Sequence, residues 1–333
     1  MSVNAPTVVV RTLENKDTME NNTFATSTYI ATSPEEAFGY LRDLRNLNEW
    51  TLYSRMLEQV DANTWRGTAS GYQHDLYYHV RPIETPMFNG VEWHCGYKYG
   101  EYFQCYPALL LPASFVGSDE PGVYFHWLSF VGPERRTPMI MQGIHLVHTA
   151  EIRSLKGALE RKAGLTEAAR GKWDVQTSSI FVDAPLDLAA GYLGDLRNLG
   201  EWAFSVHPDG SVGADTGRFT DEYGQQADVQ VRRHDLGNYV ILEFEHRYGK
   251  FDLVQRNLLM LVPCSYAFGN PKAQGCIQHR VAFFEKQELP RHGKLQIEDY
   301  GAESMSLKRI LENRAGNLMS FGRGGSYVSE QAA

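Results

Sequence analysis

Hydrophobic and polar positions alternate along most of this chain in short runs that are separated by Gly, Asn, Pro and Asp, a pattern typical of hairpin-connected β-strands. The first run, residues 24–30, is followed by Ser-Pro-Glu-Glu at 33–36, which supplies an N-cap, a proline at the first helical position and a glutamate at the third. A short helix is therefore expected to begin there. Six further strands are predicted in the first half, at 64–70, 74–81, 90–99, 102–111, 123–131 and 139–147.

Two segments show helical spacing over several turns instead. They are residues 149–169 and 302–318, and they contain RSLKGALERKAG and MSLKRILENRAG. Each follows a series of strands. Because an antiparallel sheet with one apolar face must be covered, and only such a helix is long enough to cover it, each half is expected to be a curved sheet wrapped around its C-terminal helix. The predicted fold class is α+β.

The chain contains an internal duplication. YLRDLRNLNEW at 40–50 and YLGDLRNLGEW at 192–202 share nine of eleven positions at an offset of 192 − 40 = 152 residues. This period is too long for a solenoid repeat, so each copy is expected to be a domain with its own core. The predicted domains are residues 23–169 and 173–321, with flexible terminal segments at 1–22 and 322–333.

Composition narrows the classes of function. The chain has 333 residues, 43% of them hydrophobic, and a net charge of −8, which argues against nucleic-acid binding because phosphates require a basic face. No apolar run has the length of a membrane span or the form of a signal peptide, which predicts a cytoplasmic protein without a membrane partner. The four cysteines show no metal-binding spacing and are interpreted as buried, structural thiols.

Each copy has the same order of elements: a strand, short helices (at SPEE in the first copy and at DLRNLxEW in both), antiparallel strands and a long terminal helix. This order resembles the SRPBCC superfamily of helix-grip proteins, which includes START domains and polyketide aromatase/cyclases. Two such units in one chain are similar to the didomain polyketide cyclases. The resemblance covers roughly residues 23–165 and 175–321. It implies tandem helix-grip domains, each with a cavity between sheet and helix, but a fold does not determine an activity.

The leading functional hypothesis is a cofactor-independent polyketide cyclase or dehydratase. It would fold a poly-β-keto chain in a hydrophobic cavity and close an aromatic or pyrone ring by acid-base catalysis. The expected partner is a hydrophobic polyketide-like molecule, with an acyl carrier protein as a candidate donor. Two alternatives stay open: a non-enzymatic carrier of a lipid or aromatic metabolite, and a zinc-dependent C–C hydrolase. The sequence leaves the oligomeric state open, a homodimer included.

A histidine occupies the same place in both copies. GVYFHWLSFVG at 122–132 aligns with GCIQHRVAFFE at 275–285, which puts His126 at the position of His279. Strand alternation places each histidine on the more apolar face, which we expect to point into the cavity. An imidazole there could move protons during enolisation. Both are candidate catalytic residues. The alternative is a histidine that lies in the core and is hydrogen bonded to a backbone or tyrosine oxygen.

Aromatic and imidazole side chains follow one face of two matching strands, at 90–99 and 240–248. Such a wall suits a flat unsaturated ligand, although ordinary core packing gives the same pattern. Tyr97 is a catalytic candidate, and the notable change between the copies is Tyr97 against His246. The substrate-binding candidates are Trp93, Tyr99, Tyr124, His246, Tyr248 and Tyr300.

A last group of candidates lies where the first long helix begins. His148 and Glu151 are three residues apart and share a helical face, so they are a candidate acid-base pair. His145 would complete the His/His/Glu set of the zinc alternative, which still lacks a ligand from the sheet. The first copy carries the richer His/Tyr/Glu set and is the predicted place of the chemistry. Charged residues of the second copy are predicted to be solvated, namely Glu243, Glu245, Asp252 and Arg280.

Overall fold

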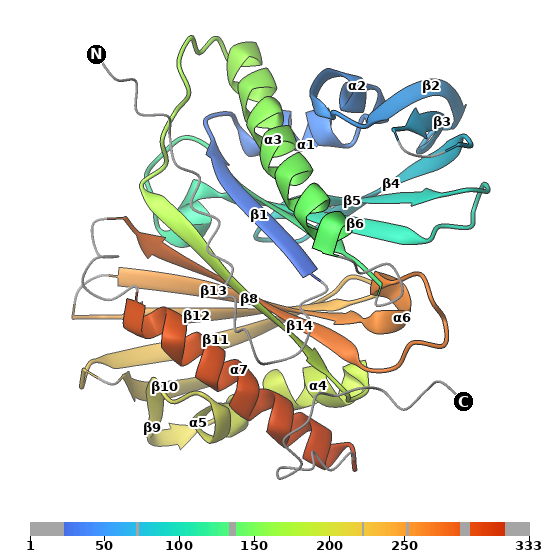
Figure 1. Cartoon of the computed structure of the whole chain (residues 1–333). Coiled ribbons are helices and arrows are strands. Elements are labelled where there is room, and N and C mark those ends of the chain that lie inside the picture. The colour runs from blue at the N-terminus through green and yellow to red at the C-terminus, as the bar shows by residue number, and fades with distance from the viewer. Residues whose placement is uncertain are drawn as a thin grey trace.

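The computed structural model describes residues 23–70, 73–132, 138–221, 223–250, 253–286 and 294–316. The terminal segments 1–22 and 322–333, predicted to be flexible, lie outside the described residues. Within the described part the chain forms two seven-stranded antiparallel sheets, each accompanied by one long helix (Figure 1). We refer to the elements from β1 to α3 as domain 1 and to those from β8 to α7 as domain 2.

Domain 1 begins with a strand and two short helices, continues through six strands and ends in a long helix. Its sheet has the order β1-β7-β6-β5-β4-β3-β2. The bounds are β1 Thr23–Ile30, α1 Pro34–Leu41, η1 Leu44–Asn46, α2 Leu47–Trp50, β2 Ser54–Asp61, β3 Thr64–Ala69, β4 Leu76–Glu84, β5 Asn89–Gly96, β6 Gln104–Pro112, η2 Ala113–Val116, β7 Val123–Phe130 and α3 Pro138–Lys162.

Domain 2 repeats this order. Its sheet runs β8-β14-β13-β12-β11-β10-β9, which matches domain 1 strand for strand and confirms the predicted α+β class with tandem helix-grip domains. The bounds are β8 Trp173–Val182, α4 Leu186–Leu193, η4 Leu196–Asn198, α5 Leu199–Trp202, β9 Val206–Val212, β10 Thr216–Asp221, β11 Gln226–Asp235, β12 Val240–Tyr248, β13 Leu253–Pro263, α6 Cys264–Ala267, β14 Cys276–Glu285 and α7 Lys294–Arg314.

The repeated sequence builds the same local structure twice. Ser33 and Glu36 form the expected capping box at the start of α1. In the shared DLRN segments, the carboxylates of Asp43 and Asp195 accept hydrogen bonds from the second backbone N–H that follows, at 3.0 and 3.1 Å. Each carboxylate thereby caps a short 3₁₀ helix.

Two of the predicted elements are wrong. Residues 139–147, predicted as a strand, belong to α3, because Ile144, His148 and Ile152 recur every four residues and continue the apolar stripe of the helix. The predicted strand 90–99 ends at Gly96, where a Cβ would collide with the carbonyl oxygen of Glu101. The strand β2 was not predicted, because its apolar and polar residues do not alternate regularly: Leu57 and Val60 are exposed beside polar neighbours.

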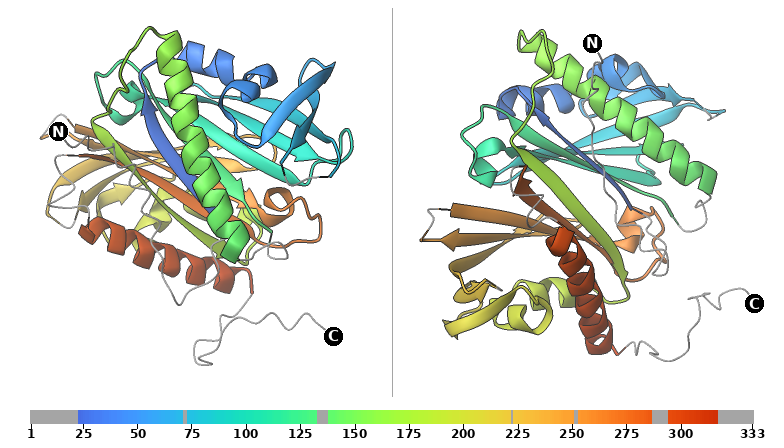
Figure 2. Two further views of the ribbon diagram at one scale, coloured as in Figure 1. Left: turned by 45° about the horizontal axis from the view of Figure 1, so that its top comes forward. Right: turned by 60° about the vertical axis from the view of Figure 1, so that its left-hand side comes forward.

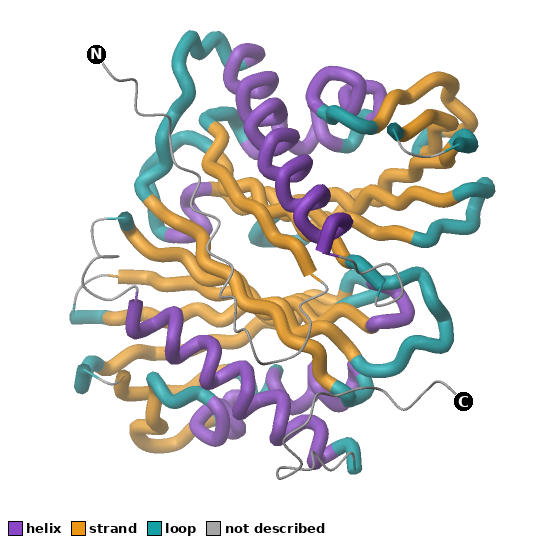
Figure 3. The backbone as a smooth tube through the Cα atoms, in the orientation of Figure 1, coloured by secondary structure: helices purple, strands orange, loops and turns teal. Residues whose placement is uncertain are grey.

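The two sheets pack back to back, and the long helices cover the two outer faces (Figures 2 and 3). Each domain has an apolar core between its sheet and its helix. A third core, drawn from both domains, fills the space between the sheets. All four cysteines are buried and free, as expected. None of the helices in the described ranges is long and apolar enough to cross a bilayer.

Candidate functional site

His126 and His279 meet between the two domains. Their Nε2 atoms are 3.0 Å apart, and both residues are completely buried. The Nδ1 atom of His126 lies 2.7 Å from Oγ of Ser27, and that of His279 lies 2.6 Å from Oγ of Ser179. These four side chains form one hydrogen-bonded chain across the interface.

The predicted orientation of these histidines toward a cavity is wrong, because both faces of their strands are apolar. On β7, Leu128 packs between the sheets, whereas Trp127 packs toward α3. Alternation alone cannot tell these faces apart. Burial lowers the pKa of His126 to about 3 and also lowers that of His279, so both imidazoles are neutral at neutral pH. A proton shuttle in a cavity therefore has no geometric basis at either residue.

Tyr97 and Tyr99 lie on the surface, not in a cavity wall. They follow the end of β5 and are 53% and 57% exposed. The hydroxyl of Tyr99 donates to the carboxylate of Asp61 at 2.9 Å. The prediction that these tyrosines face a cavity is wrong because the alternation was continued past the end of the strand.

Trp93 and Tyr124 are both packing residues. The ring of Trp93 lies 5.7 Å from that of Trp50 and 6.0 Å from that of Trp127, in the core beneath α3. Tyr124 lies in the interdomain core, and its hydroxyl donates to Glu120 at 3.0 Å. Of the two, only Trp93 therefore faces the inside of domain 1, where it is part of a cluster of tryptophans.

His148 and Glu151 lie on the buried side of α3, but they form no hydrogen bond with each other. The imidazole of His148 stacks on the indole of Trp127 with 4.0 Å between ring centroids, and burial lowers its pKa to about 3. The carboxylate of Glu151 accepts a hydrogen bond from the backbone N–H of Leu52 at 2.8 Å. Burial raises the pKa of Glu151 to about 7. The predicted direct acid-base pair is not formed.

The residues of the zinc alternative do not converge. Among the described residues, one group of three has ligand atoms that lie within 4.8 Å of one another: Glu92, His94 and Cys105 at the domain interface. Both oxygens of Glu92 already accept hydrogen bonds from Arg81, at 2.6 and 2.5 Å, and Tyr266 of domain 2 donates to it at 2.6 Å. This group is a hydrogen-bonded contact between the domains, and His145, His148 and Glu151 do not form a comparable set.

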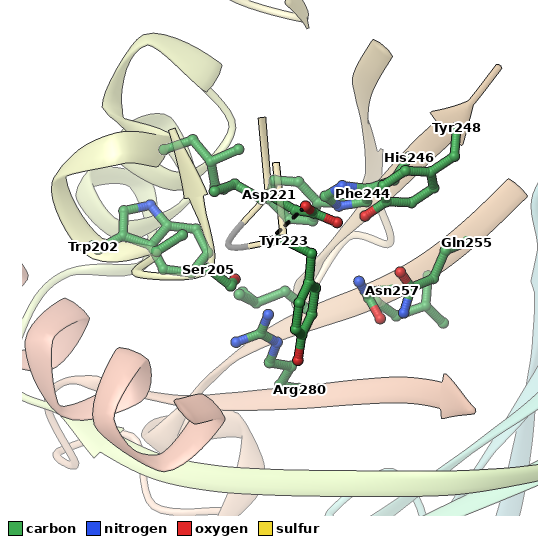
Figure 4. Close-up of a pocket in the computed structure, with 15 residues that line it drawn as sticks. Trp202, Ser205, Asp221, Tyr223, Phe244, His246, Tyr248, Gln255, Asn257 and Arg280 are labelled. Atoms are coloured by element: carbon green, nitrogen blue, oxygen red, sulfur yellow. Dashed lines mark hydrogen bonds between the residues drawn. The ribbon is translucent and has the colours of Figure 1, made fainter. Parts of the chain in front are cut away.

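A pocket opens in domain 2, between the sheet, α5 and the loop after β10 (Figure 4). Its volume is about 80 Å³, several times what a single water molecule needs. Aromatic and polar side chains share the wall. The principal ones are Trp202, Ser205, Asp221, Tyr223, Phe244, His246, Tyr248, Gln255, Asn257 and Arg280.

Arg280 lines this pocket, so its predicted exposure to solvent is wrong. Its Nη1 donates to Oε2 of Glu303 at 2.5 Å, and their side chains are 12% and 0% exposed. The other oxygen of Glu303 accepts from the backbone N–H groups of Phe204 and Ser205 and from the Ser205 hydroxyl, at 2.9, 3.2 and 2.9 Å. On β14, the face that carries His279 packs against domain 1, and the face that carries Arg280 borders the cavity.

Glu243 and Glu245 are also buried, contrary to the prediction. They are 0% and 1% exposed, on the face of β12 that turns toward domain 1. Arg232 pairs with Glu243 at 2.9 Å, and Arg256 pairs with Glu245 at 2.6 Å. The interface buries these carboxylates and supplies arginine partners for them, which the alternation of one strand cannot reveal. Asp252 lies outside the described residues.

His246 lies in the pocket wall, as does Tyr248. The Nδ1 atom of His246 is buried and has no hydrogen-bond partner. Burial, aided by the charge of Arg280, lowers the pKa of this imidazole to about 4. Strand pairing shows that its counterpart in domain 1 is Cys95, not Tyr97, because Cys95 pairs with Gln104 as His246 pairs with Gln255.

Sequence reasoning missed some of the pocket residues and did not predict which side chains would meet there. Asn257 and Ser205 were not singled out, and nothing in their sequence surroundings marks them. Arg280 was predicted to be solvated, and only the folded chain brings it against Glu303 of α7. The backbone of Tyr300 lies in α7, but its side chain lies outside the described residues.

We expect Glu151→Gln to stabilise the protein at pH 8 by about 3 kcal/mol and to change little at pH 4. With a folded-state pKa near 7, Glu151 keeps in the folded state a proton that the unfolded chain releases near pH 4.5. Stability is therefore lost as the pH rises from about 4.5 to 7, and glutamine removes this loss. Denaturant unfolding at both pH values measures the effect.

Glu303→Gln is the matched control in domain 2, because Glu303 is paired with Arg280. This variant should be less stable than the wild type at pH 8. If Glu151→Gln and the wild type show the same pH dependence of the free energy of unfolding, Glu151 is ionised in the folded protein and the expectation is wrong.

The fold and this pocket define a tandem helix-grip protein with a small pocket in its second domain. The chain belongs to a family described as a domain of unknown function (DUF8713), whose sequence model matches it twice, at residues 19–168 and 175–320. A comparison with curated proteins gave no match.

Solved structures with a similar fold include didomain proteins. The di-domain ARO/CYC StfQ from the steffimycin biosynthetic pathway is 12% identical, with a TM-score of 0.31 over 88% of this chain and 99% of that chain. The di-domain ARO/CYC BexL from the BE-7585A pathway is 9% identical, with a TM-score of 0.31 over 88% and 98%. A conserved protein from Geobacillus kaustophilus is 12% identical, with a TM-score of 0.31 over 42% and 96%. These similarities are too low for an inference about function.

Proposed function

We propose that this chain is a cyclase or dehydratase that acts on a polyketide-like poly-β-keto chain, and that the chemistry takes place in the pocket of domain 2. The observation that supports this most is the unpartnered Nδ1 of His246 in the same pocket as the guanidinium of Arg280. A neutral imidazole has a lone pair that can accept a proton from the carbon next to a carbonyl group, and the guanidinium can stabilise the enolate that forms. We therefore propose the second domain for the chemistry, whereas the sequence favoured the first.

The proposed reaction needs no cofactor. Nδ1 of His246, in the tautomer with its proton on Nε2, accepts a proton from the carbon between two carbonyl groups. Arg280 stabilises the negative charge that develops on the enolate oxygen, and Glu303 holds the guanidinium in place. The enolate carbon then attacks another carbonyl carbon of the chain, and the imidazolium returns its proton to the alkoxide oxygen, which becomes a hydroxyl. Loss of water needs a second transfer, in which the imidazole removes the remaining proton of the attacking carbon and passes it to the leaving hydroxyl. Attack of the enolate oxygen on the thioester carbonyl would instead give a pyrone, and the thiol would leave with the proton.

The size of the pocket limits what it holds. With about 80 Å³, it accommodates the reacting segment rather than a whole polyketide chain. The remainder would extend out of the pocket past Tyr223, a lining residue that is 50% exposed. Delivery of the chain by an acyl carrier protein is part of this proposal.

We expect His246→Gln to lower turnover of a linear poly-β-keto thioester by about 100-fold or more, the usual contribution of general acid-base catalysis. Glutamine preserves much of the volume and can hydrogen bond, but it cannot accept the proton. Product formation is followed by absorbance and mass spectrometry.

His207→Gln is the control, since His207 is exposed on β9 and outside the pocket. It should keep wild-type turnover. Equal turnover in His246→Gln and the wild type would exclude His246 as the base. A wild-type protein that binds the thioester without converting it would identify the chain as a carrier.

A further inference from the structure

One amide oxygen in the domain 2 pocket has no hydrogen-bond partner. It is Oδ1 of Asn257 on β13, a residue that lines the pocket and is only 8% exposed. Its β12 neighbour across the strand pair is Phe244, and His246 is the diagonal neighbour, roughly 7–8 Å away between Cα atoms. Figure 4 shows the amide beside the opening, between Gln255 and Arg280.

An unpaired acceptor in such a place indicates the chemistry of the missing partner. Buried polar atoms in native proteins are nearly always hydrogen bonded, because an unmatched one is costly. An amide oxygen can only accept a hydrogen bond, so the partner must be a donor. The adjacent cation Arg280 disfavours an ammonium group, which leaves a neutral O–H or N–H donor. Of these two donors, a poly-β-keto chain carries only the O–H, in its enol form.

The rest of the wall restricts the shape of the molecule that carries this hydroxyl. Trp202, Phe244 and Tyr248 present aromatic rings to the pocket. Aromatic walls favour flat, conjugated ligands. The ligand is thus expected to combine a planar unsaturated framework with a neutral hydroxyl group.

We propose that the pocket binds an enol or a phenol, whose hydroxyl donates to Oδ1 of Asn257. This inference rests on the proposed function in that it uses the same pocket, and it names the form of the ligand that is recognised. The keto tautomer lacks the donor, so Asn257 favours the enol of a β-diketone, and a phenolic product also satisfies it. Asn257 is then a specificity-determining residue.

The test compares two probes that differ only in the donor, 1-naphthol and 1-methoxynaphthalene, by titration calorimetry on the full chain. The wild type should bind 1-naphthol at least about tenfold more tightly than its methyl ether. In Asn257→Leu this ratio should fall below about threefold, because leucine removes the acceptor and keeps the volume. Gln226→Leu is the control, since Gln226 is exposed on β11 and lies outside the pocket; its ratio should stay at the wild-type value.

An unchanged ratio in Asn257→Leu, or failure of the wild type to bind 1-naphthol, would overturn the inference. If Asn257→Leu does not fold, as judged by circular dichroism, Asn257→Ala gives the same comparison. The expected ratios without turnover of the poly-β-keto thioester would support the binding inference and reject the proposed function. Turnover of the thioester together with an unchanged ratio in Asn257→Leu would support the proposed function and reject the binding inference.

Discussion

The two domains are expected to lose their folded structure when they are produced separately, as residues 23–169 and 173–321. The back-to-back sheets share an apolar core that includes Phe115, Leu128, Met260 and Phe283. Exposing even five large side chains of this core costs about 1.5–3 kcal/mol each, and the sum of about 7–15 kcal/mol equals the whole stability of an ordinary domain. Circular dichroism and thermal unfolding of each part measure the loss.

Co-production of the two parts is the control for this expectation. Association would cover the shared core again and restore the hydrogen bond between Tyr266 and Glu92 and the contact between His126 and His279. A cooperative unfolding transition in either isolated part would show that its own core is sufficient. In that case, the interface would be a docking surface between independent domains.

Arg280→Met is expected to destabilise the protein by about 3–5 kcal/mol, because it leaves the buried carboxylate of Glu303 without its cationic partner. The double variant Arg280→Met/Glu303→Gln should recover most of this loss, since no uncompensated charge remains. Both variants should lose turnover, because both lack the guanidinium. Denaturant unfolding and the thioester assay separate the effect on stability from that on chemistry.

Arg218→Met provides the comparison at the surface. Arg218 pairs with Asp228, and both side chains are more than half exposed. Removal of this arginine should change stability by less than about 1 kcal/mol. If Arg280→Met also changes stability by less than about 1 kcal/mol, the three other hydrogen bonds of Glu303 compensate its charge. The pairing with Arg280 then contributes little to stability.

Local patterns in the sequence were sufficient to predict the elements that form through contacts between residues close together in the chain. The capping box at Ser33 relies on contacts within a few residues, so the sequence predicts it. The segment 139–147 was assigned wrongly because a short apolar run fits a strand and a buried helix equally well. The strand β2 escaped notice because its exposed side chains carry little alternation.

The candidate site was harder to predict for a physical reason that one strand illustrates. On β14, His279 and Arg280 are neighbours and point to opposite faces. Sequence reasoning assigned the apolar face to the cavity, as in a sheet with a single buried face. Here both faces are buried, one against the other domain and one beneath α7, so the polarity of the strand no longer reports which side is inside.

The sequence by itself determined the duplication, the α+β class and the order of elements in each copy, because repeats, caps and periodicity are properties of the chain read locally. It also placed His246 and Tyr248 on a shared strand face, which proved to be the pocket wall. Only the tertiary structure decided that the sheets pack back to back, that His126 and His279 meet, and that Asn257 lines one pocket together with Arg280, which is paired with Glu303. These depend on contacts between residues far apart in the chain, and a local pattern carries no information about which distant surface will cover it.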